Sequence, residues 1–431
     1  MSSEDSLLVA FDGNESGPSA CSPDELAPTR EWSDTTLGEF ISLQRGHDLP
    51  EYERRSGDVP VMGSFGITGW HDVARASGPG VTVGRSGASF GVVSYCACDY
   101  WPLNTCLYAT DYRGNDPRFA YYLLKSVDFR RYNSGSAQPS LNRNYIRDMP
   151  IRAPSLPEQR RIAATLGALD GKIELNRCMN YTLESIARAI FKSWFVDFDP
   201  VRKKMQGGEV GLPPDLAALF PSSLAERENG DVPQGWSLGT LGDVGVRIRS
   251  QARPEELESG TPYFGLEHLP RRSIALSDWG VADGVVSAKS RFVAGDLLFG
   301  KLRPYFHKVG PAPVDGVCST DIVVVRPRRP TLGGFVLGHL SSAEFVDYAS
   351  ATSSGTRMPR TNWKDMAAYP VVMPPNDVVE AFEAAVSGLL QRIRNNILES
   401  RRLAEARDAL LPNLLSGELR SLTKTAPLEA R

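Results

Sequence analysis

The feature that most constrains the fold of this 431-residue chain is an internal repeat. Short segments of the first half recur in the same order in the second half, at offsets that grow from 204 to 216 and then to 220. The matched pairs are Trp32-Ser33 with Trp236-Ser237, Leu37-Gly38-Glu39 with Leu241-Gly242-Asp243, Gly84-Arg85 with Gly300-Lys301, and Ser134-Gly135 with Ser354-Gly355. Chance does not supply an ordered series of this kind, so the sequence predicts two copies of one fold.

Each copy ends in a long helical pattern, and the two patterns align at the offset of 220. Their apolar and amide residues recur every three or four positions, which is the heptad spacing of helices packed along a seam. We expect the helix–helix positions to be Ile162, Leu166, Leu169, Ile173, Asn176, Asn180 and Leu183 in the first helix, and Phe382, Val386, Leu389, Ile393, Asn396 and Leu403 in the second. Asparagines in such a seam cost stability but fix register and orientation. The alternative is two unrelated amphipathic helices, each on its own globular core.

The rest of the chain follows from these two helices. Short alternating strand-like runs, broken by Gly and Pro, predict α+β domains before each helix. The predicted order is an acidic tail (1–31), a first domain (32–154), a long helix (155–199) ended by Pro200, a linker (200–235), a second domain (236–375), a second long helix (376–420) and a short tail (421–431). Seven acids and one base give residues 1–31 a charge of −6, so the remaining chain carries +3. A tail of this composition is expected to be disordered, and a mildly basic body permits DNA binding.

Several function classes lack support in the sequence. We find neither a long apolar span nor a secretory signal, which predicts a cytoplasmic protein without a membrane partner. The six cysteines form no CxxC pair and are expected to be reduced thiols, and we predict no metal site. The chain has no GxxxxGK[ST] phosphate loop, no recognisable methyltransferase or nuclease motif, and only five histidines. We therefore expect no catalytic residues and no catalysis by this chain alone.

Longer segments carry a resemblance to a known family. They are GSAQPSLNRNYIRDMPI from Gly135, LPEQRRIAATLGALDGKIELNR from Leu156, IFKSWFVDFDPV from Ile190, VPQGW from Val232, YFGLEHL from Tyr263, GDLLFGKLRPYFHKV from Gly295 and LLPNLLSGELR from Leu410. With these segments in this order, residues 32–420 resemble the specificity subunits of type I restriction-modification systems. Any one segment alone, such as VPQGW, would be a weak signal.

The resemblance implies a function and an arrangement. Each domain would be a target-recognition domain that reads one half of a two-part site in double-stranded DNA, and the antiparallel helices would set the unread spacer. The subunit would bind two methyltransferase subunits and recruit restriction/translocase subunits. It would bind no cofactor itself, because S-adenosylmethionine, ATP and Mg²⁺ belong to the partner subunits. An internal pseudo-two-fold repeat suits two copies of one partner.

Candidate DNA-binding residues lie in the matched Gly-containing segments. Base edges are read chiefly by Arg or Lys at guanine and by Asn or Gln at adenine, while glycines let the backbone approach phosphates. We select Arg85, Ser86, Ser136, Gln138, Asn142 and Arg143 in the first domain, and Lys301, Arg303, Tyr305, Thr356, Arg357, Arg360 and Lys364 in the second. Alternatively, the matched segments are only a folding signature with solvated charges. Because the two domains should read different half-sites, specificity is expected where the copies diverge, as at Arg143 and Trp363.

Two other function classes remain open at this point. The chain could be a self-contained nuclease or methyltransferase with an unfamiliar site, or a coiled-coil scaffold without a DNA role. The apolar residues that end the helices, such as Trp194, Phe195 and Leu414, either pack against the opposite domain or dock a partner subunit.

Overall fold

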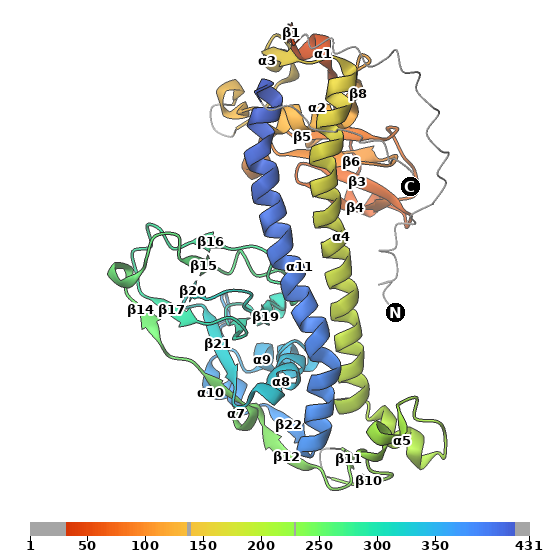
Figure 1. Ribbon diagram of the computed structural model, residues 1–431, viewed down its shortest axis with the longest axis vertical. Coiled ribbons are helices and arrows are strands. Elements are labelled where there is room, and N and C mark those ends of the chain that lie inside the picture. Colours follow the sequence, from red (N-terminus) through yellow and green to blue (C-terminus); the bar gives the residue numbers. More distant parts are fainter. Residues whose placement is uncertain (1–31, 136–138, 228–229, 419–431) are drawn as a thin grey trace, which may run out of the picture. The chain divides into compact units, whose positions relative to one another are not determined.

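A computed structural model describes residues 32–135, 139–227 and 230–418. Contacts between Cα atoms divide the chain into two compact units (Figure 1). Unit 1 comprises the residues up to Gly171 together with those from Ala404 onward, and unit 2 comprises Lys172–Leu403. Each unit therefore includes one copy of the sequence repeat and a part of both long helices.

The centre of unit 1 is a four-stranded antiparallel sheet in the order β2-β8-β5-β6. Its strands are β2 (Ser42–Arg45), β5 (Gly80–Gly84), β6 (Val93–Cys96) and β8 (Cys106–Asp111). A smaller sheet, β4-β3-β7, contains one parallel pair and consists of β3 (Val59–Gly63), β4 (Gly66–His71) and β7 (Trp101–Pro102). An antiparallel ribbon of β1 (Ser33–Thr36) and β9 (Pro150–Ala153) pairs the first strand of the copy with its last.

Three short helices complete the first copy: α1 (Leu37–Phe40), α2 (Pro117–Lys125) and α3 (Arg143–Arg147). The start of α2 is set locally, because Pro117 occupies its first turn and the Asp116 carboxylate accepts the Phe119 N–H at 2.8 Å. This helix buries its apolar face against the four-stranded sheet. The resulting core includes Phe119, Tyr122, Leu124, Val81, Val83, Leu107, Ile162, Leu166, Leu411 and Leu414.

Unit 2 has a four-stranded antiparallel sheet in the order β13-β21-β18-β19. Its strands are β13 (Gly245–Arg247), β18 (Leu297–Gly300), β19 (Val309–Pro311) and β21 (Ile322–Pro327). A second sheet, β14-β17-β20-β15-β16, consists of β14 (Gln251–Ala252), β15 (Pro262–Phe264), β16 (Gly280–Val281), β17 (Lys289–Phe292) and β20 (Gly316–Cys318). As in unit 1, an antiparallel ribbon, here β12 (Ser237–Thr240) with β22 (Pro370–Met373), pairs the ends of the copy.

The strand pairs of the two units match at the offsets found in the sequence. Gly84 pairs with Cys106 in unit 1, and Gly300 pairs with Ile322 in unit 2, so both partners are displaced by the offset of 216. Thr36 pairs with Pro150, and its counterpart Thr240 pairs with Pro370, at offsets of 204 and 220. The repeated sequence segments thus have repeated backbone registers.

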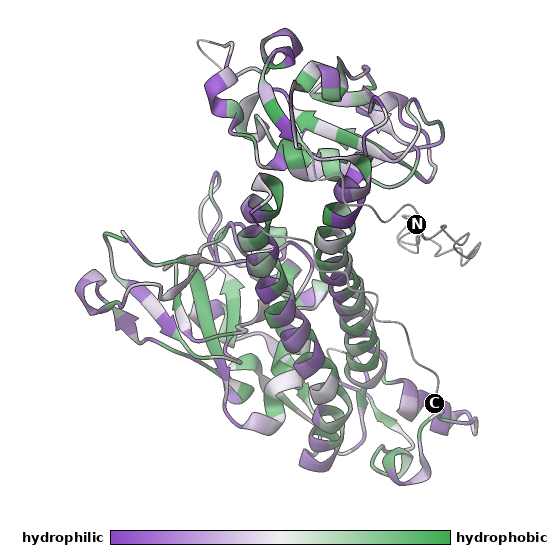
Figure 2. Cartoon of the chain, turned by 45° about the horizontal axis from the view of Figure 1, so that its top comes forward, coloured by the Kyte–Doolittle hydropathy of each residue, from purple (hydrophilic) through white to green (hydrophobic). Residues whose placement is uncertain are grey.

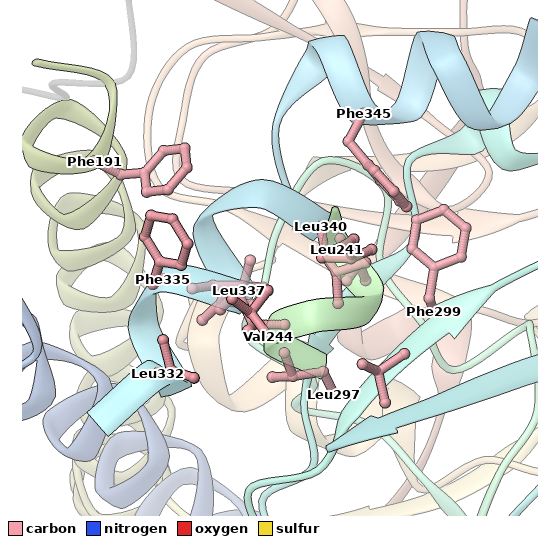
Figure 3. Packing of buried hydrophobic residues seen from close by; sticks show 14 of the residues in the cluster. Phe191, Leu241, Val244, Leu297, Phe299, Leu332, Phe335, Leu337, Leu340 and Phe345 are labelled. Atoms are coloured by element: carbon pink, nitrogen blue, oxygen red, sulfur yellow. The ribbon is translucent and has the colours of Figure 1, made fainter. Parts of the chain in front are cut away.

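The core of unit 2 lies between its four-stranded sheet, its helices and one end of the first long helix. Its shorter helices are α7 (Leu241–Val244), α8 (Gly333–Leu340), α9 (Ala343–Ala351) and α10 (Trp363–Ala367). Figure 3 shows Phe191 facing Phe335 of α8, with ring centroids 6.3 Å apart, and Phe345 of α9 facing Phe299 of β18, 5.4 Å apart. Hydrophobic strands lie at the centre of unit 2, whereas hydrophobic and hydrophilic patches alternate along both long helices (Figure 2).

The two long helices are α4 (Leu156–Phe195) and α11 (Asn376–Ser416), with 40 and 41 residues. At 1.5 Å per residue each is about 60 Å long. Within unit 2 they run antiparallel: the Asn176 amide donates to Glu399 at 2.9 Å, and the Asn396 amide donates to Asn180 Oδ1 at 2.9 Å. Within unit 1, Asp170 of α4 accepts from Arg407 of α11 at 2.6 Å.

The predicted helix–helix residues occupy different depths. Ile162 and Leu166 are buried with the end of α11 in the core of unit 1. In unit 2 the buried members are Asn176, Asn180, Phe382, Val386, Ile393 and Asn396. Leu169, Ile173, Leu183, Leu389 and Leu403 are half-buried. Phe382 lies among aromatic rings of α4, 4.9 Å from Phe195 and 5.8 Å from Trp194, so these apolar residues pack in the second domain.

The ends of the helices differ from the expected positions. α4 ends at Phe195 rather than at residue 199, and Pro200 lies in the first turn of the next helix, α5 (Asp199–Met205). A proline suits a first turn because the N–H that it lacks has no partner there. The last described residue of α11 is Ser416, and Gly417 follows with φ of +79°, the left-handed geometry that ends many helices.

The segment expected to be a linker, 200–235, is largely folded. It contains the rest of α5, α6 (Pro214–Ala218), β10 (Leu224–Ala225) and β11 (Val232–Pro233). Its Phe220 is buried 5.1 Å from the Trp194 ring, so this segment packs on the core of unit 2. Two of its prolines, Pro200 and Pro214, lie in the first turns of helices. Composition alone could not distinguish such a segment from an extended linker.

Three further observations concern the described residues only. No helix there is both long and apolar enough to cross a membrane. Residues 32–135, 139–227 and 230–418 contain no cluster of three or more His, Cys, Asp or Glu side chains suited to a metal ion. The cysteines at positions 96, 98, 106, 178 and 318 are free thiols. The predicted tails, 1–31 and 421–431, lie outside the described residues.

Candidate nucleic-acid interface

In unit 1 the loop after β5 is joined to the segment before α3 by backbone hydrogen bonds. The Arg85 carbonyl accepts the Leu141 N–H at 2.7 Å, and Gly87 donates its N–H to the Pro139 carbonyl at 3.3 Å. Ser86 and Ser140 form an isolated β-bridge at the same place. These bonds bring Arg85 and Ser86 close to Asn142 and Arg143, which lie much later in the sequence.

The corresponding segments of unit 2 make corresponding bonds. The Lys301 carbonyl accepts the Thr361 N–H at 3.1 Å, and Arg303 donates its N–H to the Pro359 carbonyl at 2.8 Å. Ser354 and Arg360 exchange two backbone hydrogen bonds, of 3.0 and 2.9 Å. Lys301 and Arg303 match Arg85 and Gly87 at the offset of 216, and their partners Thr361 and Pro359 match Leu141 and Pro139 at the offset of 220. The two units therefore present side chains from one backbone frame.

An open hollow of about 640 Å³ lies in front of this frame in unit 1. We refer to it as the first hollow, and it is lined by Gln44, Arg45, Gly46, His47, Asp48, Arg85, Leu107, Ser134, Ser140, Leu141, Asn142 and Arg143. Three of the predicted residues, Arg85, Asn142 and Arg143, therefore share one concave surface. Asn142 is also the N-cap of α3, since its side-chain oxygen accepts the Asn144 N–H at 3.0 Å. Ser136 and Gln138 lie outside the described residues.

Three arginines, Arg45, Arg85 and Arg143, line the first hollow and give it a positive charge. Arg85 is half-buried and donates to the Asn104 carbonyl at 3.1 Å. Burial, followed by the nearby charge of Arg45, lowers the pKa of Arg85. Burial, followed by the charge of Arg75, likewise lowers the pKa of His47. The carboxylate of the hollow, Asp48, accepts from the Asn104 amide. An anion in this hollow would therefore relieve repulsion between guanidinium groups.

In unit 2 the predicted cations are arranged around a carboxylate. Lys301 Nζ and Arg360 Nε lie 3.9 and 3.5 Å from the same oxygen of Asp321. Arg303 has a left-handed backbone, with φ of +52°, and its guanidinium lies 6.0 Å from the Phe306 ring centroid. Tyr305 is 52% exposed beside that ring. These four residues form one group, whose charge is partly neutralised within the protein.

The other predicted residues of unit 2 are more peripheral. Thr356 and Arg357 are exposed in the turn that the Ser354–Arg360 hydrogen bonds close. Lys364 is exposed on α10, whose N-cap is Asn362, the counterpart of Asn142. Arg143 itself corresponds to Trp363, which is half-buried.

Sequence reasoning missed the residues that β2 contributes to the first hollow. Gln44 and Arg45 end β2, in which Arg45 pairs with Leu107 of β8, and His47 follows two residues later. A signal was present, because Arg45 continues the offset of 204 and matches Arg249. The matched segments stop before this position, so only the pairing of strands brings Arg45 next to Arg85.

Comparisons with known proteins agree with this arrangement. Residues 29–185 match the family model of the type I restriction modification DNA specificity domain. The chain is 24% identical to the type I restriction enzyme HindI specificity subunit of Haemophilus influenzae, over 70% of this chain and 77% of that protein. It is 27% identical to the type I restriction enzyme EcoDI specificity subunit of Escherichia coli, over 70% of each chain. Residues 29–185 therefore match a type I DNA specificity domain, and the chain is similar to type I specificity subunits over 70% of its length.

A solved structure supports the fold of this chain. The S subunit of a type I restriction-modification system from M. genitalium is similar over 90% of this chain and 97% of that chain, with a TM-score of 0.53 and 18% identity. At this identity the likeness concerns the fold alone. The family model covers the first copy and most of α4, and the second copy has the same strand order in its four-stranded sheet.

Proposed function

We propose that this specificity subunit reads a two-part sequence in double-stranded DNA, with one target-recognition domain for each half. The first domain would use the residues of the first hollow, and the second the group around Lys301 and Arg303. These domains would only bind the DNA sequence. The chain would therefore act as a non-catalytic subunit of a larger methyltransferase and endonuclease, whose other subunits carry out the chemistry.

The observation that carries this proposal is one backbone frame with unlike side chains. At matched positions the frame presents Arg85 and Ser140 in the first domain but Lys301 and Arg360 in the second. Shared hydrogen bonds hold these positions at the same place in each fold, while base readout depends on the side chain alone. Unlike side chains on one frame suit the reading of two different half-sites. The shared backbone frame suits contacts to phosphates, which are the same in every sequence.

We further propose that α4 and α11 form an antiparallel coiled coil that sets the unread spacer between the half-sites. Asn176 and Asn396 support this, because they hold equivalent positions in the repeat and lie next to one another, with the Asn176 amide 3.5 Å from the Asn396 carbonyl. Equivalent residues meet in this way on a pseudo-two-fold axis. Such an axis would present similar surfaces to two methyltransferase subunits.

The partners of the proposed assembly follow from the family. The relatives are named as subunits of type I restriction enzymes. We propose that two methyltransferase subunits bind this chain in the cytoplasm and that restriction/translocase subunits join them. S-adenosylmethionine, ATP and Mg²⁺ would then be bound by those partners, and none by this chain.

Methylation assays test this proposal against a self-contained enzyme. The purified chain, incubated with host DNA, S-adenosylmethionine and Mg²⁺, is expected to give neither methylated nor cleaved DNA. Co-expression with the methyltransferase subunit is expected to give methylation at one two-part motif, mapped by single-molecule sequencing. Product from the chain alone would favour an enzyme. A scaffold without a DNA role predicts methylation that is independent of this chain and DNA binding without a steep salt dependence.

A further inference from the structure

Unit 1 has a second hollow, of about 310 Å³, that adjoins the first one. Its lining includes Arg113, Arg143, Arg147, Asn144 and Ser42, together with apolar residues and Gly38, but no acidic residue. Arg143 lines both hollows, so they are neighbours on the surface of the first domain. Together they bring five arginines into one series: Arg85, Arg45, Arg143, Arg147 and Arg113.

Of the residues that line the two hollows beside these five arginines, one is acidic, Asp48 of the first hollow. Within residues 32–135, 139–227 and 230–418, none of the five forms an ion pair with a carboxylate. Their polar contacts are with neutral groups: Arg85 donates to the Asn104 carbonyl, and Arg113 donates to the Ser42 hydroxyl at 3.0 Å. Like charges at this density repel one another and disfavour the folded state, unless a polyanion compensates.

The backbone positions the series. β2 carries Arg45 at its end and Ser42 at its start, and α3 carries Arg143 and Arg147 one turn apart. The stem of Arg147 crosses Gly38, where a Cβ would lie 2.6 Å from Arg147 Cγ. A glycine at position 38 leaves room for this stem, and the matching Gly242 lies similarly close to α10, where a Cβ would lie 3.2 Å from Ala367 Cβ.

The second domain lacks this series although it has the same frame. Arg143 and Arg147 correspond to Trp363 and Ala367. Lys301, the counterpart of Arg85, shares the Asp321 carboxylate with Arg360, and Asp321 itself replaces Thr105. Arg329, the counterpart of Arg113, donates to the side chain of Asn376 at 2.9 Å. Arg329 and Arg249, which matches Arg45, both stay exposed, so the second domain keeps two of the five cations in exposed positions.

We propose that Arg45, Arg85, Arg113, Arg143 and Arg147 form a track for the DNA phosphate backbone, and that the first domain supplies most of the sequence-independent affinity. This inference rests on the proposed function. Unpaired guanidinium groups release condensed counterions when they meet phosphates, whereas cations already bound to Asp321 contribute less. Both domains would then read sequence, whereas the first domain would make most of the electrostatic contacts with the DNA backbone.

The test is the salt dependence of binding to random-sequence duplex DNA, measured with the full chain. Each lost phosphate contact reduces the slope of log K against log salt by about 0.9. R113Q/R147Q is therefore expected to reduce the slope by about 1.8 and to weaken binding on the order of 50-fold at about 0.1 M salt. R113K/R147K, which keeps both charges, is expected to restore most of the slope.

The control with the same change in charge is R152Q/R160Q, which removes two exposed arginines of the same unit that line neither hollow. Arg152 differs from the track residues in that it is paired with Asp34 at 3.2 Å. Its slope is expected to stay close to that of the wild type, with equal thermal stability of all variants as the check on folding. The track is refuted if R113Q/R147Q and R152Q/R160Q lower the slope equally. D321N is expected to steepen the slope by freeing Lys301 and Arg360, and an unchanged slope would overturn the asymmetry between domains. If the wild type itself shows no salt-dependent DNA binding, the proposed function fails instead.

Discussion

The ion pair between Asp170 of α4 and Arg407 of α11 gives a prediction that can be worked out in numbers. The two side chains are 2.6 Å apart in unit 1, and they are only 21% and 15% exposed. Tyr122 of α2, whose side chain is buried, donates its hydroxyl to the other carboxylate oxygen at 2.6 Å. One carboxylate thus joins both long helices to the core of the first domain.

The expected coupling follows from this burial. Two unit charges at about 4 Å attract by about 4 kcal/mol at an effective dielectric constant of 20. Desolvation opposes this attraction, and Arg407 keeps a second partner, Asp408, at 2.7 Å. We therefore expect a double-mutant coupling of about 2 kcal/mol between Asp170→Ala and Arg407→Ala. Asp170→Ala alone should cost about 3 to 4 kcal/mol, because it also leaves the buried Tyr122 hydroxyl without an acceptor.

Hydrogen exchange with peptide resolution measures these free energies in unit 1 separately from unit 2, through the amides of α2 and the last turns of α11. The control cycle uses Asp34 and Arg152 of the same unit, which are 3.2 Å apart but 88% and 59% exposed. Its coupling should be below about 0.5 kcal/mol. A coupling for Asp170 and Arg407 no larger than that of the control would refute the role given to burial.

Three further outcomes are expected. Phe382→Ala should destabilise unit 2 by about 3 to 5 kcal/mol in urea unfolding, since Phe382 is 1% exposed, whereas Val281→Ala, at a site 50% exposed, should cost less than about 0.5 kcal/mol. Burial lowers the pKa of His339 from 6.5 to about 3, so its contribution to the stability of unit 2 is lost as pH falls below 6.5. Below pH 6.5 the free energy of unfolding should fall less steeply with pH in H339F than in the wild type, by up to about 1.4 kcal/mol per pH unit. Equal plots of unfolding free energy against pH for the variant and the wild type would contradict this. Adding four residues to both helices, near Asn176 and Asn396, extends each by about 6 Å and should lengthen the unread spacer in methylation maps, while changed half-sites would count against the spacer role.

The sequence predicted the parts of the fold that leave a periodic or repeated signal. The heptad spacing located both long helices to within a few residues of their ends, because side chains that face a packed partner recur at a fixed interval. The offsets of 216 and 220 paired Arg85 with Lys301 and Asn142 with Asn362, and these residues occupy matching places in the two backbone frames.

The sequence could not predict contacts that depend on strand pairing. Arg45 reaches Arg85 only through the register of β2 with β8, and Arg113 and Arg147 meet at a hollow that no local pattern marks. The neutralising role of Asp321 was hidden for the same reason, since the pairing of β21 with β18 brings it beside Lys301. Pro200 was misplaced because a proline ends one helix and starts another with the same local signal.

Each copy of the repeat is expected to read its own half of the target. The direct measurement exchanges residues 236–375 for the same segment of a specificity subunit with another target, with co-expression of the methyltransferase subunit in a host without this methylation. Single-molecule sequencing should then show one half of the motif changed, with the other half and the spacer retained. A motif that changes in both halves, or in neither, would contradict the division of labour between the two domains.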